Sequence, residues 1–122
     1  MMRLDLTTLF GVLVGVLLAA PVAAQSLSGS YAVAGTNLDG SPYGGSAEVV
    51  WTSDTSCEIF WNTGGTSSQG ICMRSGTVFT AAYVLGDKIG MVIYRIQSGG
   101  VLDGLWTVSG TDGAGTEVLT PQ

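Results

Sequence analysis

"LDGLWTVSGTDGAGTE", residues 102–117, repeats near the end of the chain a phrase that occurs near its start, "LSGSYAVAGTNLDGS", residues 27–41. Of fourteen aligned positions, six have the same residue and a seventh is aromatic in both phrases. The matched pairs are Leu27/Leu102, Gly29/Gly104, Tyr31/Trp106, Val33/Val108, Gly35/Gly110, Thr36/Thr111 and Gly40/Gly115. Two explanations are open: a functional loop present twice, or a fold whose two ends meet.

The segment between the two phrases decides between these explanations. Short stretches rich in Val, Ile, Tyr, Trp and Thr alternate with turns rich in Gly, Asp, Asn and Ser every 8 to 14 residues, which predicts an all-β sandwich or barrel. The predicted strands are Ser28–Gly35, Gly45–Thr52, Ser56–Asn62, Gln69–Arg74, Val78–Leu85, Lys88–Ile96, Val101–Ser109 and Thr116–Leu119. Short hairpins between them predict an antiparallel meander.

A meander leaves its first and last strands as unpaired edges unless the sheet closes. A phrase repeated at both ends suits two adjacent strands, or two equivalent corners, of a small up-and-down barrel. Each glycine would let its strand bend, and each aromatic residue would plug the floor of the barrel. We therefore expect about eight strands closed into a barrel, with chance similarity as the alternative.

The two cysteines test the predicted register. A hairpin centred on Gly64 and Gly65 places Cys57 opposite Cys72, at a separation that a disulfide can bridge. The same register puts Phe60, Ile71 and Met73 on the face opposite the cysteines. A metal site is the rival, but the sequence has no His, and two thiolates do not complete a tetrahedral site. We expect one disulfide and no metal.

The N-terminus has the features of a signal peptide. Arg3 precedes an apolar run of 12 residues, Leu9–Ala20, which is followed by Pro21 and small residues. We place the cleavage after Ala24, which leaves residues 25–122 as one domain of 98 residues. The run is short against the ~20 residues that span a bilayer. A retained membrane anchor is the alternative, and the protein would then lie at a membrane.

Charge and residue content exclude several function classes. Residues 25–122 contain eight acidic and three basic residues, which is a net charge of −5 and disfavours nucleic acid as a partner. Without His, and with both cysteines oxidised, no nucleophile has an obvious base. "NLDGS" and "TDGAG" lack the carboxylates of a calcium loop, and no helix follows "GTDGAG" as a dinucleotide fingerprint requires. We predict no catalytic residue and no cofactor, with a hydrolase as a remaining alternative.

Protein contact is the better supported class. The stretch "GMVIYRI", residues 90–96, is apolar on both faces of its strand, so part of the outer surface should be apolar. Tyr43 lies in a predicted loop, and Arg95 interrupts the apolar strand beside Tyr94. The candidate partner-contact residues are Tyr43, Phe60, Ile71, Met73, Tyr94 and Arg95.

The phrases "GSYAVAGTNLDGSPYGG", "CEIFW…TSSQGICMR", "GMVIYRI" and "GVLDGLWTVSGTDGAGTEVLTP" cover nearly all of residues 25–122. On them the chain resembles a group of small exported bacterial proteins, mostly alphaproteobacterial, that are often labelled fibronectin-binding proteins. No site residues are assigned in that group, so none is carried over. In architecture alone the chain is similar to periplasmic barrels that inhibit proteases or lysozyme, and to avidin-like barrels.

Together these observations predict a periplasmic or secreted, non-enzymatic binding protein. Its partner would be another protein, which the resemblance suggests is an extracellular-matrix protein such as fibronectin. Two alternatives remain open: a periplasmic inhibitor of a protease or lysozyme, and a barrel that binds a small ligand.

Overall fold

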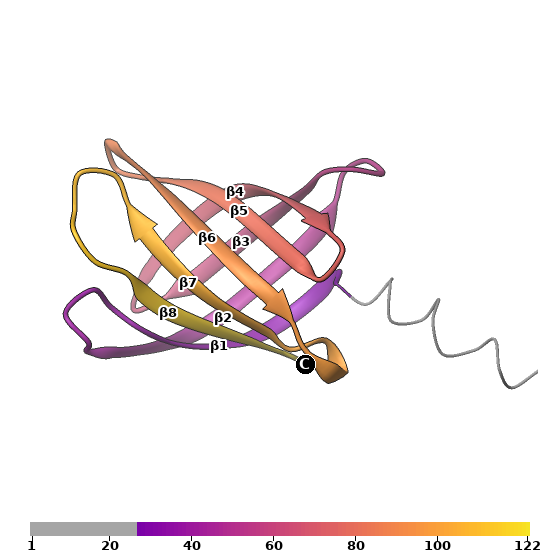
Figure 1. Cartoon of the computed structure of the whole chain (residues 1–122), viewed down its shortest axis with the longest axis horizontal. Helices are drawn as coiled ribbons and strands as arrows, with labels where there is room; N and C mark the ends of the chain where they lie inside the picture. Colours follow the sequence, from indigo (N-terminus) through magenta and orange to yellow (C-terminus); the bar gives the residue numbers. More distant parts are fainter. Residues whose placement is uncertain (1–26) are drawn as a thin grey trace, which may run out of the picture.

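Every strand of the barrel is paired on both sides, because the last strand closes onto the first. The computed structural model describes residues 27–122, and Figure 1 shows the strands wound around one axis. In chain order the strands are β1 (Gly29–Thr36), β2 (Pro42–Trp51), β3 (Cys57–Thr63), β4 (Thr66–Ser75), β5 (Val78–Leu85), β6 (Lys88–Ile96), β7 (Leu102–Val108) and β8 (Gly115–Pro121). A 3₁₀ turn, η1 (Ser98–Gly100), precedes β7. All pairs are antiparallel, so the predicted closed eight-stranded meander is confirmed.

The repeated phrases occupy the two strands that flank β8. β1 and β7 each pair with β8, from opposite sides, so the repeats lie at equivalent positions and are not adjacent to each other. Tyr31 is fully buried near the chain termini, where its hydroxyl donates to the carbonyl of Leu27. Trp106 does not plug the floor as we expected. It lies toward the opposite end of the barrel, where it lines a cavity.

The cysteine hairpin has the predicted register. Cys57 pairs with Cys72, Ile59 with Gly70, and Trp61 with Ser68. Cys57 and Cys72 form a disulfide across the two strands, with their Cα atoms 4.9 Å apart. Gly64 and Gly65 have φ angles of 56° and 80°, the left-handed values that a two-residue hairpin of this type requires. The turn glycines therefore fix both the register and the disulfide.

The two ends of the barrel differ. The hairpins at residues 37–41, 64–65, 86–87 and 109–114 lie at one end, which is on the left in Figure 1. We call this the open end. The connections at residues 52–56, 76–77 and 97–101 lie at the other end, the closed end, together with both termini of the described chain. Side chains fill the closed end, and Phe79 stacks on Tyr94 there with ring centroids 5.9 Å apart.

The predicted signal peptide, residues 1–24, lies outside the described residues. Within residues 27–122, no helix has the length and hydrophobicity needed to cross a membrane.

Candidate functional site

A cavity of about 260 Å³ opens at the open end of the barrel. Strands on every side contribute to its wall, and large aromatic side chains dominate it. Trp61 and Tyr83 meet edge to face with ring centroids 5.1 Å apart, and Tyr43 and Trp106 do so at 6.4 Å. The lining residues are Asn37, Tyr43, Trp61, Thr63, Gly64, Thr66, Ser68, Tyr83, Leu85, Val92, Trp106 and Glu117.

The carboxylate of Glu117 projects into this cavity from β8. Glu117 is 6% exposed and is the buried charged residue of the described part of the chain. Its Oε2 accepts hydrogen bonds from Trp61 Nε1 at 2.9 Å and from the hydroxyl of Tyr94. Its Oε1 accepts one from the hydroxyl of Tyr43 at 2.7 Å. Three neutral donors on three strands therefore hold one carboxylate.

Glycines on the neighbouring strands make room for this arrangement. Glu117 pairs with Gly104 on β7 and with Gly35 on β1. Gly104 in turn pairs with Tyr94, and Gly35 with Tyr43. An added Cβ would lie 2.6 Å from the Tyr94 ring at Gly104, and 2.5 Å from the Tyr43 ring at Gly35. Each tyrosine ring thus crosses a glycine to bring its hydroxyl to the carboxylate.

Burial and the charge of Glu117 shift the tyrosines that surround it. Burial is the larger cause and raises the pKa of Tyr83 to about 12, with the Glu117 charge adding to the effect. The same two causes, together with the hydrogen bond to Glu117, raise the pKa values of Tyr43 and Tyr94 well above their ordinary range. All three hydroxyls stay protonated near neutral pH, and those of Tyr43 and Tyr94 donate to the carboxylate.

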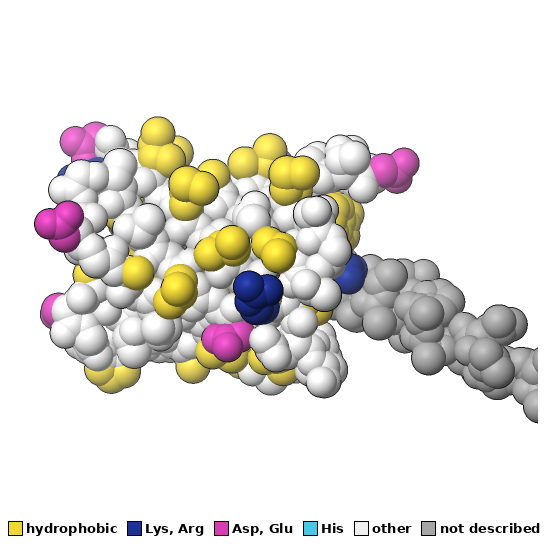
Figure 2. Space-filling model, viewed as in Figure 1, with side chains coloured by type: hydrophobic (Ala, Val, Ile, Leu, Met, Phe, Trp, Pro, Cys, Tyr) yellow, Lys and Arg dark blue, Asp and Glu magenta, His cyan; other side chains and the backbone are white. Residues whose placement is uncertain are grey.

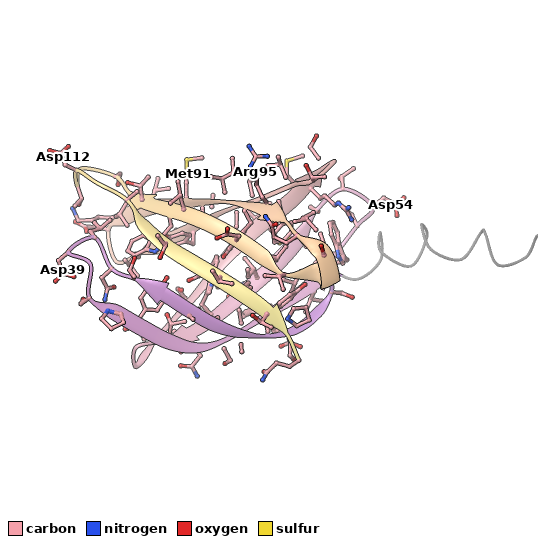
Figure 3. All side chains as sticks on the ribbon, turned by 60° about the horizontal axis from the view of Figure 1, so that its bottom comes forward. Asp39, Asp54, Met91, Arg95 and Asp112 are labelled. Carbon is pink, nitrogen blue, oxygen red and sulfur yellow. A yellow bond between two sulfur atoms is a disulfide. The ribbon has the colours of Figure 1, made fainter. Side chains whose placement is uncertain are left out.

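The rim of the cavity is acidic. Asp39, Asp87 and Asp112 lie in three of the four hairpins at the open end, against one basic residue, Lys88. Figure 3 shows Asp39 and Asp112 at this end and Asp54 at the other. Hydrogen bonds from Ser41 lower the pKa of Asp39, so it is ionised at neutral pH.

The expected apolar outer surface is present. On β6, Ile89, Met91 and Ile93 are each more than half exposed, while Val92 and Tyr94 point inward. Cross-strand neighbours extend this surface from β4 to β7, where Figure 2 shows apolar side chains gathered. We call this surface the outer apolar band. Its exposed residues are Ile71, Met73, Val84, Ile89, Met91, Ile93 and Leu105.

The predicted partner-contact residues do not form one group. Ile71, Met73 and Arg95 are on the outer surface of the strands that form the band, and Figure 3 shows Arg95 pointing away from the barrel. Phe60 is half-buried on β3, outside the band. Two predictions need correction. Tyr94 is fully buried because strand alternation turns it inward, and Tyr43 belongs to β2 and lines the cavity.

Sequence reasoning did not place Glu117 inside the barrel. The available signal was alternation along β8, which puts Gly115, Glu117 and Leu119 on one face. Residues 27–122 contain no group of three His, Cys, Asp or Glu side chains placed to hold a metal ion. Ser68, Thr63 and Thr66 place aliphatic hydroxyl groups in the described cavity wall, and none of its lining residues is a His or Lys that could act as their base.

Comparison with known proteins identifies the fold. No model of a protein family and no curated protein matches the chain. Among solved structures, the redesigned β-barrel mFAP1 bound to DFHBI is similar, with 22% sequence identity, a TM-score of 0.67, and coverage of 80% of this chain and 97% of that one. A de novo designed fluorescence-activating β-barrel has 19% identity and a TM-score of 0.64, with coverage of 82% of this chain and 97% of that one. At these identities the likeness shows the barrel architecture alone.

Proposed function

We propose that the protein is a non-enzymatic binding protein that holds a small organic molecule in the cavity at the open end. The observation that carries the proposal is a largely preformed cavity with aromatic walls and one buried polar group, the carboxylate of Glu117. Ligand sites have this composition, with apolar walls that supply affinity and a few polar groups that fix orientation. The mFAP1 barrel, which is bound to DFHBI, shows that a barrel of similar shape can hold a small molecule.

The cellular compartment of the protein is a second part of this proposal. The Cys57–Cys72 disulfide is compatible with an oxidising environment, and the predicted signal peptide supports export to the periplasm or beyond.

A matched pair of serine variants tests the site. Ser68 lines the cavity opposite Trp61, whereas its neighbour Ser67 points outward. Ser68→Phe should fill the cavity with its side chain, and Ser67→Phe should leave the cavity open to a ligand. A panel of small organic molecules of both charges, screened by ligand-observed NMR, should give hits that Ser68→Phe abolishes and Ser67→Phe retains. Hits that survive Ser68→Phe would place binding elsewhere and refute the proposal.

The outer apolar band favours a second candidate function, contact with another protein through an apolar, weakly charged surface. Exposed apolar patches of this kind on a small protein mark interaction sites. The sequence resemblance makes fibronectin the first partner to test. Immobilised fibronectin should retain the wild-type protein and not the variant Ile93→Ser/Met91→Ser. Equal retention of both would exclude the band as the contact surface.

A further inference from the structure

Resting on the proposed function, we infer that the ligand is a small organic cation: an amine protonated at nitrogen, attached to an apolar body that fits between the aromatic walls. Four features of the cavity point to this chemistry: the bonding capacity left on Glu117, its uncompensated charge, the rings around it, and the charge at the rim.

Glu117 can accept one more hydrogen bond. A carboxylate offers about two lone-pair sites on each oxygen. Oε2 already accepts from Trp61 and Tyr94, whereas Oε1 accepts from Tyr43 only. Glu117 is part of the cavity wall, so we expect an N–H group of a ligand to reach Oε1 from the cavity.

The charge of the carboxylate has no cationic partner in the described cavity. Its three hydrogen-bond donors are neutral, and the wall contains no lysine or arginine. Arg74 lies at the closed end, where its Nε donates to the carbonyl of Gly76. A charge removed from water is costly unless it is paired, so a cationic ligand would supply the missing partner. An anionic ligand would meet repulsion here.

The aromatic walls favour the same sign of charge. The faces of aromatic rings carry negative electrostatic potential and attract ammonium groups, most strongly for Trp and Tyr. Tyr43, Trp61, Tyr83 and Trp106 all line the cavity, and Trp61 and Tyr43 also contact the carboxylate. Trp61 and Tyr43 meet the carboxylate through their N–H and O–H groups, at the ring edge, so a ring face for the ammonium group would come from Tyr83 or Trp106.

The rim would steer a cation toward the cavity. Asp39, Asp87 and Asp112 lie in three of the four hairpins at the open end, where Lys88 is the one basic residue that the structure describes. Clefts edged by charges of one sign raise the local concentration and the association rate of ligands of the opposite sign.

A set of three probes with one shared body tests the inference. Phenethylamine, phenethyl alcohol and 3-phenylpropionate carry a cationic, a neutral and an anionic group on the same phenylethyl body. Calorimetry and tryptophan emission should show the amine binding about tenfold or more tightly than the alcohol, because only the amine adds an ion pair to its hydrogen bond with Glu117. The anionic probe, 3-phenylpropionate, should not bind.

Glu117→Gln separates charge from shape. The glutamine oxygen can accept from Trp61 and Tyr94, and its NH₂ can donate to the Tyr43 hydroxyl oxygen. The Tyr43 hydroxyl can then donate its own proton to the carbonyl of Thr116, 3.3 Å away. The variant should bind the amine no more tightly than the alcohol. Should it fail to fold, Asp112→Asn at the rim and Asp54→Asn at the closed end form a second pair. Only Asp112→Asn should slow association of the amine at low salt.

The outcomes distinguish this inference from the proposal beneath it. If probes bind in the cavity, as judged by competition and by the Ser68→Phe variant, but the alcohol or the carboxylate binds as tightly as the amine, the inference is overturned and the proposed function stands. If neither these probes nor the wider panel binds in the cavity, both are overturned.

Discussion

The ring of Tyr94 on β6 lies against the α-carbon of Gly104 on β7 and reaches the carboxylate of Glu117 on β8 beyond it. An added Cβ at Gly104 would come within 2.6 Å of the ring and 2.9 Å of the carbonyl of Ile93. Gly104→Ala should therefore lower the free energy of unfolding by roughly 1–3 kcal/mol, the usual cost of overpacking. Urea denaturation measures this change.

Gly44→Ala is the matched control for Gly104→Ala. A Cβ at Gly44, on β2, would meet only the carbonyl oxygen of Val33, at 3.4 Å, which is ordinary contact. Its denaturation midpoint should equal or exceed that of the wild type, because alanine reduces the conformational freedom of the unfolded chain. Equal midpoints for Gly104→Ala and wild type would show that the Tyr94 ring does not depend on the missing side chain.

Glu117→Leu should destabilise the barrel more than Glu117→Gln. Leucine removes the acceptor for Trp61 Nε1 and for the Tyr94 hydroxyl, both of which are buried. Each donor left without an acceptor costs about 1–3 kcal/mol. Chemical denaturation of the two variants side by side measures the difference. A leucine variant as stable as the glutamine variant would mean that water reaches these donors.

The disulfide should stabilise the barrel through the unfolded chain. Cys57 and Cys72 are separated by 15 residues, and closing a loop of that length contributes about 3 kcal/mol on the chain-entropy model. The double variant Cys57→Ala/Cys72→Ala should lose at least a comparable free energy of unfolding. Alkylation of unreduced, denatured protein should add no label in mass spectrometry. Two labels would show that the cysteines are free.

High pH should unfold the protein. The pKa values of all four tyrosines, Tyr31, Tyr43, Tyr83 and Tyr94, are raised by burial, with Tyr83 at about 12. In the unfolded chain they titrate near pH 10. Above that pH the unfolded state holds fewer protons than the native state, so the stability present below about pH 10 is lost as the pH rises through the native pKa values.

Absorbance at about 295 nm reports the tyrosinate that forms during this titration. The native protein should show little tyrosinate at pH 10, where a sample in denaturant is half ionised. Tyr83→Phe should reduce the tyrosinate that forms above pH 10. Native tyrosines that titrate together near pH 10 would show that they are solvated.

The sequence predicted most of the fold because its signals are local. The Gly64–Gly65 turn and the two cysteines fixed the β3–β4 register correctly. The start of β4 was placed too late, at Gln69, because Thr66–Ser68 has no apolar residue and resembles a loop. Pairing with Trp61, Asn62 and Thr63 across the hairpin makes it a strand.

The candidate site was much harder to predict. A carboxylate is expected at the surface, and only the full circuit of strands brings Glu117 to Trp61, which is 56 positions away in the sequence. Tyr94 was placed in a surface patch because its strand is apolar on both faces and gives no inward signal. Its role appears only once Gly104 is known to lie beside it.

The backbone amide of Gln122 donates to the carbonyl of Ser30, so the last residue of the chain lies beside the start of β1 at the closed end. A short flexible linker could therefore join Gln122 to the first residues of the described chain without altering a strand. Cutting the joined chain at the Gly86–Asp87 turn would produce a circularly permuted protein whose new termini flank the cavity mouth, as attachment points for a reporter of its occupancy.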